Sequence, residues 1–194
     1  MAVSDTSFPR LVSLAAHDLR TPLATISGFA QTIVRMGELE APVDRYMGMI
    51  VEASRQLAEL LDELGLAARI EAGRYEPNLQ PANTLDLARI AADELGSERV
   101  SVSGEGGEVT VDVEATRRGI SALVQAALRH GGLDEVDVRA DGSTVTIRPV
   151  TESSGRVLLG EDLRDLGAAV AVRLVHALGG SVALDGDSVA VRLP

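Results

Sequence analysis

The sequence contains no cysteine, no tryptophan and no lysine, and aromatic residues make up only 2% of it. Without cysteine there can be no disulfides, no thiolate catalysis and no cysteine metal sites. All 18 basic residues are arginine, so a lysine nucleophile and a phosphate-binding lysine are also excluded. The scarcity of aromatic rings argues against binding of single-stranded nucleic acid by base stacking. We therefore expect a core of aliphatic side chains.

The chain is acidic, with a net charge of −11. Such a charge repels phosphate backbones and anionic membranes, which argues against nucleic acid or lipid as the main partner. The content of hydrophobic residues, 45%, and of charged residues, 24%, is typical of a folded globular protein. The sequence has no run of about 18 apolar residues, and residues 1–10 lack the pattern of a signal peptide. A cytoplasmic protein is expected, with no membrane segment in this chain.

Residues 10–73 carry two amphipathic helical patterns, separated by a turn at residues 37–42. Their apolar residues repeat in heptads, which predicts two long antiparallel helices packed along one seam. The predicted seam residues are Val12, Ala15, Leu19, Pro22, Ile26, Phe29, Ile33 and Met36 in the first helix, and Tyr46, Ile50, Ala53, Leu57, Leu60, Leu64 and Ala67 in the second. Met47, Leu61 and Ala68 add a further apolar stripe, which a homodimeric four-helix bundle would bury. The alternative is a hairpin that packs against its own second domain.

The hydrophobic period changes after a linker predicted at residues 74–82. Helices are expected at 84–95, 115–130 and 166–178, with short alternating strands between them. The C-terminal stretch "SVALDGDSVAVRLP" contains two alternating runs around an Asp-Gly pair, which predicts a β-hairpin. Residues 83–194 are therefore predicted to form an α/β sandwich with a mostly antiparallel sheet. With the helical hairpin and a short tail at residues 1–9, the fold class is α+β.

The stretch "HDLRTPLATISGF", which begins at His17, resembles the H-box of the dimerisation and phosphoacceptor domain of sensor histidine kinases. The family pattern is histidine, an acid, any residue, arginine, threonine or asparagine, proline and leucine. "LAELLDELGLAARIEAG" resembles the second helix of that domain, so the resemblance covers residues 10–73 without a gap. Residues 83–194 resemble the Bergerat-like ATP-binding domain of the same kinases. The resemblance implies two-component or phosphorelay signalling with His17 as the phosphoacceptor.

The chemistry of the H-box stretch agrees with this resemblance. The heptads place His17 opposite the predicted seam, and a neutral imidazole has a lone pair that can accept a phosphoryl group. Asp18 could bind the other ring N–H and fix the tautomer, and Pro22 removes a helix hydrogen bond and is expected to bend the helix. A lone histidine would be interpreted first as a solvated helix residue. The accompanying Asp18, Arg20, Thr21 and Pro22 favour the chemical interpretation.

The resemblance also assigns roles to the residues around His17. In the family, the acid and a threonine or asparagine three residues later position the water that dephosphorylates the partner. This implies that Asp18 and Thr21 are phosphatase residues as well as neighbours of the phosphoacceptor. Arg20, Pro22 and Thr25 are expected to form part of the face on which a response-regulator receiver domain docks.

The second domain departs from the family at the positions that hold nucleotide. In these kinases an asparagine ligates Mg²⁺, an aspartate reads the adenine, and glycines let the backbone approach the phosphates. Ala126 stands at the asparagine position and Glu152 at the aspartate position. Ser154 and Arg156 replace the glycines of the first glycine box, and Asp165 replaces the first glycine of the second. These losses argue against ATP binding, so no intrinsic cofactor is expected and Mg²⁺ would be supplied by the receiver partner.

The other charged residues of this domain are not predicted to form a catalytic or metal site. An acidic surface is expected around Glu161, Asp162 and Asp165, and it would repel a triphosphate. Neither His130 nor His176 has an acid at a telling spacing, so no metal site is indicated.

Three functions remain open from the sequence. The first is a dimeric histidine phosphotransferase, in which His17 exchanges a phosphoryl group with aspartates of receiver domains. The second is the catalytic core of a sensor histidine kinase, with ATP-dependent autophosphorylation of His17. The third is a non-catalytic pseudokinase that only binds other signalling proteins. A receiver phosphatase is an enzymatic variant of the first.

Overall fold

The computed structural model describes residues 7–37, 39–96 and 98–194, and the chain divides into two compact units, Met1–Arg74 and Tyr75–Pro194. Most of the tail predicted at residues 1–9 lies outside the described residues. Within the part of the chain that the structure describes, no helix is both long and apolar enough to cross a membrane.

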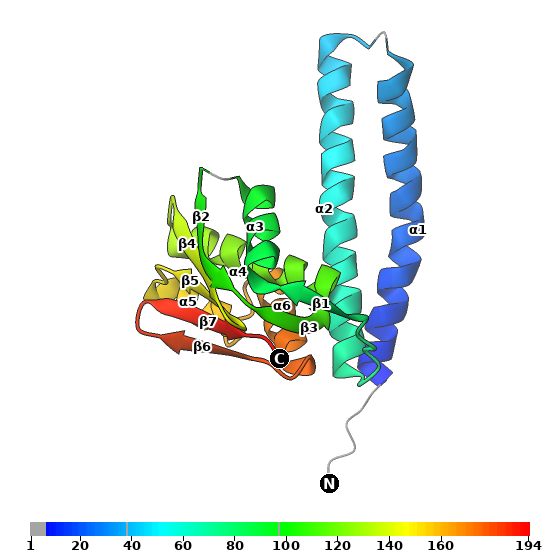
Figure 1. The fold of residues 1–194 in the computed structure, drawn as a ribbon. Helices are drawn as coiled ribbons and strands as arrows, with labels where there is room; N and C mark the ends of the chain where they lie inside the picture. The colour runs from blue at the N-terminus through cyan, green and yellow to red at the C-terminus, as the bar shows by residue number, and fades with distance from the viewer. Residues whose placement is uncertain (1–6, 38, 97) are drawn as a thin grey trace. The chain divides into compact units, whose positions relative to one another are not determined.

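The first unit is a hairpin of two long helices, α1 (Ser7–Met36) and α2 (Ala41–Glu71) (Figure 1). Helix α1 continues through Pro22 as one helix. Helix α2 has a proline in its first turn, where the missing N–H costs no hydrogen bond. It ends just before Gly73, which adopts a left-handed conformation with φ of 63°. The predicted helical hairpin is confirmed.

The buried residues between α1 and α2 are mostly small and differ from the large ones predicted. Ala16, Leu23 and Ala30, spaced by seven, are the buried apolar residues of α1, and they share the unit with buried Ser54, Gly65 and Ala68 of α2. A Cβ at Gly65 would lie 4.0 Å from the Cβ of Ala16, so the two backbones approach closely there.

Most of the large predicted seam residues are instead exposed in the single chain, so that part of the prediction was wrong, while Val12, Leu64 and Ala67 are half-buried. Leu19 is 55% exposed, Ile26 54% and Phe29 68%. Both stripes have the same heptad period and lie next to each other on the helix, so periodicity alone cannot say which one faces the second helix. Close backbone approach selects the stripe with the smaller side chains.

The second unit is an α/β sandwich with a five-stranded sheet in the order β2-β4-β5-β7-β6 and a separate β1-β3 pair. Its helices are α3 (Thr84–Leu95), α4 (Val113–Gly131), α5 (Glu152–Leu158) and α6 (Leu166–Ala177). Its strands are β1 (Leu79–Asn83), β2 (Val100–Gly106), β3 (Glu108–Asp112), β4 (Val136–Asp141), β5 (Thr144–Arg148), β6 (Ser181–Asp185) and β7 (Ser188–Arg192). Only β2 and β4 pair in parallel; the other pairs are antiparallel, as expected.

Two elements of this unit differ from the sequence interpretation. Strand β1 lies mostly within the predicted linker at 74–82, and it pairs with β3 from Leu79 to Asn83. Helix α5 occupies the segment compared above with the first glycine box. Thr151 caps α5 and exchanges hydrogen bonds with Ser154, which forms a capping box with a serine in place of the usual acid or amide.

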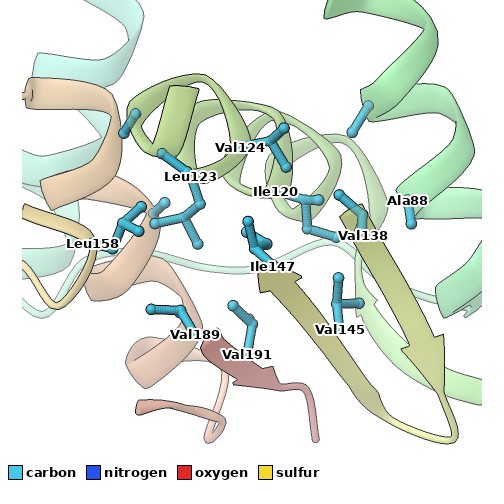
Figure 2. Packing of buried hydrophobic residues seen from close by; sticks show 14 of the residues in the cluster. Ala88, Ile120, Leu123, Val124, Val138, Val145, Ile147, Leu158, Val189 and Val191 are labelled. Carbon is cyan, nitrogen blue, oxygen red and sulfur yellow. The ribbon is translucent and has the colours of Figure 1, made fainter. Parts of the chain in front are cut away.

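The core of the second unit lies between one face of the sheet and its helices (Figure 2). Along β4, buried and exposed residues alternate, and β5 and β7 likewise bury every second residue. This alternation leaves one face of the sheet apolar and the other polar. Ile120, Leu123 and Val124 of α4 pack toward the buried valines and isoleucine of β5 and β7.

Substituting the centre of this core should be strongly destabilising. Leu123 is 0% exposed, and Leu123→Ala would leave a cavity among well-packed aliphatic side chains. We expect a loss of about 2–5 kcal/mol of unfolding free energy for the second unit, measured by urea denaturation. The control is Leu163→Ala, which removes a side chain that is 66% exposed and should change stability by less than about 0.5 kcal/mol. Equal effects of the two substitutions would contradict the assigned core.

Candidate functional site

His17 is held on the outside of α1 by the packing of its neighbour. Ala16 is 1% exposed and lies against Gly65 of α2. The next residue is turned by about 100° around the helix axis and therefore faces away from the seam. The side chain of His17 is accordingly 74% exposed.

The imidazole of His17 is engaged at one nitrogen. Its Nδ1 lies 3.2 Å from Oδ1 of Asp18, whose side chain is itself 66% exposed. A carboxylate only accepts hydrogen bonds, so Nδ1 must carry the proton and Nε2 then holds the free lone pair of the neutral ring. Among the described residues none hydrogen-bonds Nε2. The arrangement presents a nucleophilic nitrogen to solvent.

Thr21, Pro22 and Thr25 continue the exposed surface along α1. Thr21 stands three residues after Asp18 and four after His17, so all three lie on neighbouring faces of the helix. The hydroxyl of Thr25 donates to the backbone carbonyl of Thr21 over 3.1 Å. Pro22 has no N–H, so it cannot donate the usual helical hydrogen bond to the carbonyl of Asp18.

Arg20 also forms an ion pair between the two helices, which the sequence did not reveal. Its Nη2 donates to Oδ1 of Asp62 on α2 over 2.6 Å, with both side chains half exposed. This ion pair braces the hairpin one turn from His17. Asp62 was missed because 42 residues separate it from Arg20, and only the hairpin brings them together.

Comparison with known proteins agrees with this geometry. Residues 10–73 match the family described as "His Kinase A (phospho-acceptor) domain". Residues 10–73 are a histidine kinase phosphoacceptor domain. The resemblance found in the sequence is therefore confirmed for the hairpin.

The phosphoacceptor domain and the unit after it are also similar to sensor kinases from several bacteria. The chain is 30% identical over 98 residues, half of its length, to a probable sensor histidine kinase TcrY of Mycobacterium tuberculosis. It is 29% identical over 224 residues, with 95% of the chain covered, to the histidine protein kinase DivJ of Caulobacter vibrioides. The chain spans 20% and 37% of the length of these two relatives. It is thus related to the histidine kinases of two-component signalling.

A solved structure extends the likeness over both units of the chain. The crystal structure of full-length ShkA in complex with AMPPNP matches 94% of this chain and 44% of its own, with a TM-score of 0.68 and 20% identity. At this identity the likeness concerns the fold alone. It confirms the predicted fold, a long helical hairpin followed by an α/β sandwich.

The unit after the phosphoacceptor domain has unusual residues at the positions assigned above to nucleotide contacts. Ala126 is completely buried in α4 and offers no oxygen for a metal ion. Ser154 is also completely buried, and its hydroxyl is used in the cap of α5. Glu152 lies exposed in the first turn of α5.

Asp165 differs most from the sequence expectation. It caps α6, with Oδ1 accepting a hydrogen bond from the N–H of Ala168 over 3.0 Å. Its Oδ2 lies 3.1 Å from Nη1 of Arg129 and 3.0 Å from Nε2 of His130, both in the last turn of α4. The residue is only 8% exposed. One prediction was therefore wrong, because Asp165 is not part of an acidic surface. The acidic partner of His130 lies 35 residues away in the chain, so sequence spacing did not reveal it.

The other two acids of the expected acidic surface are paired as well. Asp162 accepts a hydrogen bond from Nε of Arg164 over 2.8 Å, and Glu161 lies 3.7 Å from Nε of Arg156. Each carboxylate thus has an arginine beside it, which weakens the repulsion predicted for this loop.

These residues do not fit a bound nucleotide. The position that should ligate Mg²⁺ is a buried methyl group, and the helix start that should face phosphate carries a buried carboxylate. The negatively charged carboxylate of Asp165 would repel a phosphate group bound at the start of α6.

Proposed function

We propose that this protein is a histidine phosphotransferase, in which His17 exchanges a phosphoryl group with aspartates of response-regulator receiver domains. The observation that carries the proposal is the exposed imidazole of His17 with Nδ1 held by Asp18 and Nε2 facing solvent. A nucleophile of this kind needs only a partner that presents an activated phosphoryl group in line with it.

The phosphoryl transfer needs only the imidazole of His17 and the aspartyl phosphate of the receiver. The Nε2 lone pair attacks the phosphorus of the receiver's aspartyl phosphate, an N–P bond forms, and the P–O bond to the aspartate breaks. The aspartate leaves with the electron pair as a carboxylate. The ring keeps its proton on Nδ1 and becomes positively charged, and the carboxylate of Asp18 stabilises this charge at 3.2 Å. The reverse reaction passes the group to a second receiver.

The residues around His17 supply a surface on which a receiver can dock. Arg20, Pro22 and Thr25 are exposed beside the histidine, and Arg20 is oriented by its ion pair with Asp62. Thr21 lies one turn from Asp18, where the two can hold a water near a docked aspartyl phosphate. A receiver phosphatase activity of the same site follows from this placement.

We further propose that the hairpin forms a homodimeric four-helix bundle. The exposed apolar stripe of the single chain would supply the second seam, and it comprises Leu19, Ile26, Phe29, Ile33 and Met36 of α1 and Val43, Tyr46, Ile50, Leu57 and Leu60 of α2. Monomeric proteins rarely expose a continuous stripe of this kind. Burial of its large side chains would add to the small-residue seam within each chain.

The absence of a fitting nucleotide site favours transfer between receivers over autophosphorylation. Ala126 and Asp165 support this choice, since each removes a different contact to Mg²⁺ or phosphate. Losing several charge-assisted contacts, each worth about 1.5–3 kcal/mol, would put ordinary micromolar affinity out of reach.

The second candidate is the core of a sensor histidine kinase that labels His17 from ATP. It is favoured by the similarity to relatives that are named as kinases. It requires a nucleotide site that tolerates the replacements described above.

A single experiment separates the two candidates. The purified protein is mixed with a phosphorylated receiver domain and Mg²⁺, with and without ATP, and acid-labile phosphate on His17 is followed over time. We expect labelling from the receiver without ATP, and no labelling from ATP and Mg²⁺ alone at high protein concentration. Labelling from ATP alone, with none from the receiver, would overturn the phosphotransferase proposal in favour of the kinase.

A further inference from the structure

The first turn of α6 and the last turn of α4 meet around the carboxylate of Asp165. The N–H of Ala168 and the side chains of Arg129 and His130 all point hydrogen-bond donors at one carboxylate, that of Asp165. Two elements separated along the chain thus supply three donors to a group that is only 8% exposed. The side chain of His130 is itself 17% exposed, so the pair is largely shielded from water.

Proteins commonly hold phosphate with a helix N-terminus and charged side-chain donors of this kind. The first N–H groups of a helix and its dipole attract anions, and arginine and histidine add charge and directed donors. All of these donors are present here, and the carboxylate of Asp165 accepts their hydrogen bonds. The donors are therefore present in this chain, although Ala126 offers no oxygen to a metal ion.

We propose that Asp165 is an internal substitute for phosphate, which joins α4 to α6 and excludes phosphate-bearing ligands from the start of α6. This goes beyond the proposed function, which states only that nucleotide contacts are lost. An entering phosphate would have to share the same donors with a carboxylate about 3 Å from each of them. A phosphate and the carboxylate would compete for the same three donors and repel each other, so we expect the carboxylate to exclude the phosphate.

The proposal predicts that removing the carboxylate converts the site into a phosphate site. In Asp165→Gly, the helix start retains a residue that caps acceptably, while Arg129 and His130 lose their anion. The full chain is melted in increasing inorganic phosphate, with sodium chloride matched for ionic strength. We expect Asp165→Gly to melt below the wild type without phosphate and to gain several degrees as phosphate is added. The wild type should gain only the general stabilisation that phosphate gives any protein.

Two variants distinguish a specific site from general loss of structure. Asp165→Asn keeps the shape and a capping oxygen without the charge, and it should also gain phosphate-dependent stability. The matched control is Asp162→Gly, which removes a nearby carboxylate that pairs only with Arg164 in the described contacts and should behave as the wild type. Adding Arg129→Ala to Asp165→Gly should abolish most of the gain.

The inference is overturned if neither Asp165 variant is stabilised by phosphate beyond the wild type, or if the wild type gains as much as they do. It is separable from the proposed function. Transfer from a phosphorylated receiver to His17 is measured on the same Asp165 variants, and we expect it to be retained. Failure of transfer in the wild type would overturn the proposed function and leave the phosphate result unaffected.

Discussion

His17→Gln is expected to abolish phosphoryl transfer from a receiver completely. Glutamine keeps a polar side chain on the exposed face of α1, but its amide nitrogen has no free lone pair, so no N–P bond can form. Because the side chain of His17 is 74% exposed, the helices should stay folded. Acid-labile phosphate on the protein should fall to background, while circular dichroism and melting temperature stay at wild-type values.

Two further variants make this result specific. His176→Gln is the matched control, since it makes the same change at an exposed histidine of α6, and it should transfer at the wild-type rate. Thr21→Ala should leave labelling of His17 intact and slow the loss of phosphate from the receiver. If His17→Gln retained full signalling in cells, the protein would be a non-catalytic binding module, and the proposed transfer would be wrong.

Ile26→Glu is expected to dissociate the proposed dimer. Ile26 is 54% exposed in the single chain and lies in the middle of the apolar stripe on α1. In a four-helix bundle the substitution would bury two unpaired carboxylates, and each costs several kcal/mol. We expect the dissociation constant to rise by about 100-fold or more, because every 1.4 kcal/mol changes it tenfold. Analytical ultracentrifugation over a range of concentrations measures this shift.

The matched control for Ile26→Glu is Ala24→Glu. Ala24 is exposed on the same helix, but it lies about 160° around the helix axis from Ile26 and outside the stripe. This variant should sediment as the wild type. A wild-type chain that is monomeric at high concentration would contradict the dimer, and equal dissociation by both variants would contradict the assigned face.

The helices, the β6–β7 turn and the contact between His17 and Asp18 could be predicted from the sequence, because residues close together in the chain determine them. Heptads on both sides of a turn expected at residues 37–42 predicted the hairpin, and α3 was expected at residues 84–95 and lies at Thr84–Leu95. The Asp-Gly pair placed the turn between β6 and β7. His17 and Asp18 are adjacent in the chain, so their contact needs nothing beyond the geometry of one helix.

What the sequence by itself determined, then, is most of the order of elements, the match of residues 10–73 to the phosphoacceptor domain, and the position of His17 beside Asp18. The tertiary structure decided which of two equally periodic stripes faces the second helix, because only close approach at Ala16 and Gly65 separates them. It also decided the partners of Arg20 and Asp165, which lie 42 residues away in one case and 35 and 36 in the other. A buried carboxylate must find donors within about 3 Å, and the chain supplies them only after α4 and α6 have packed.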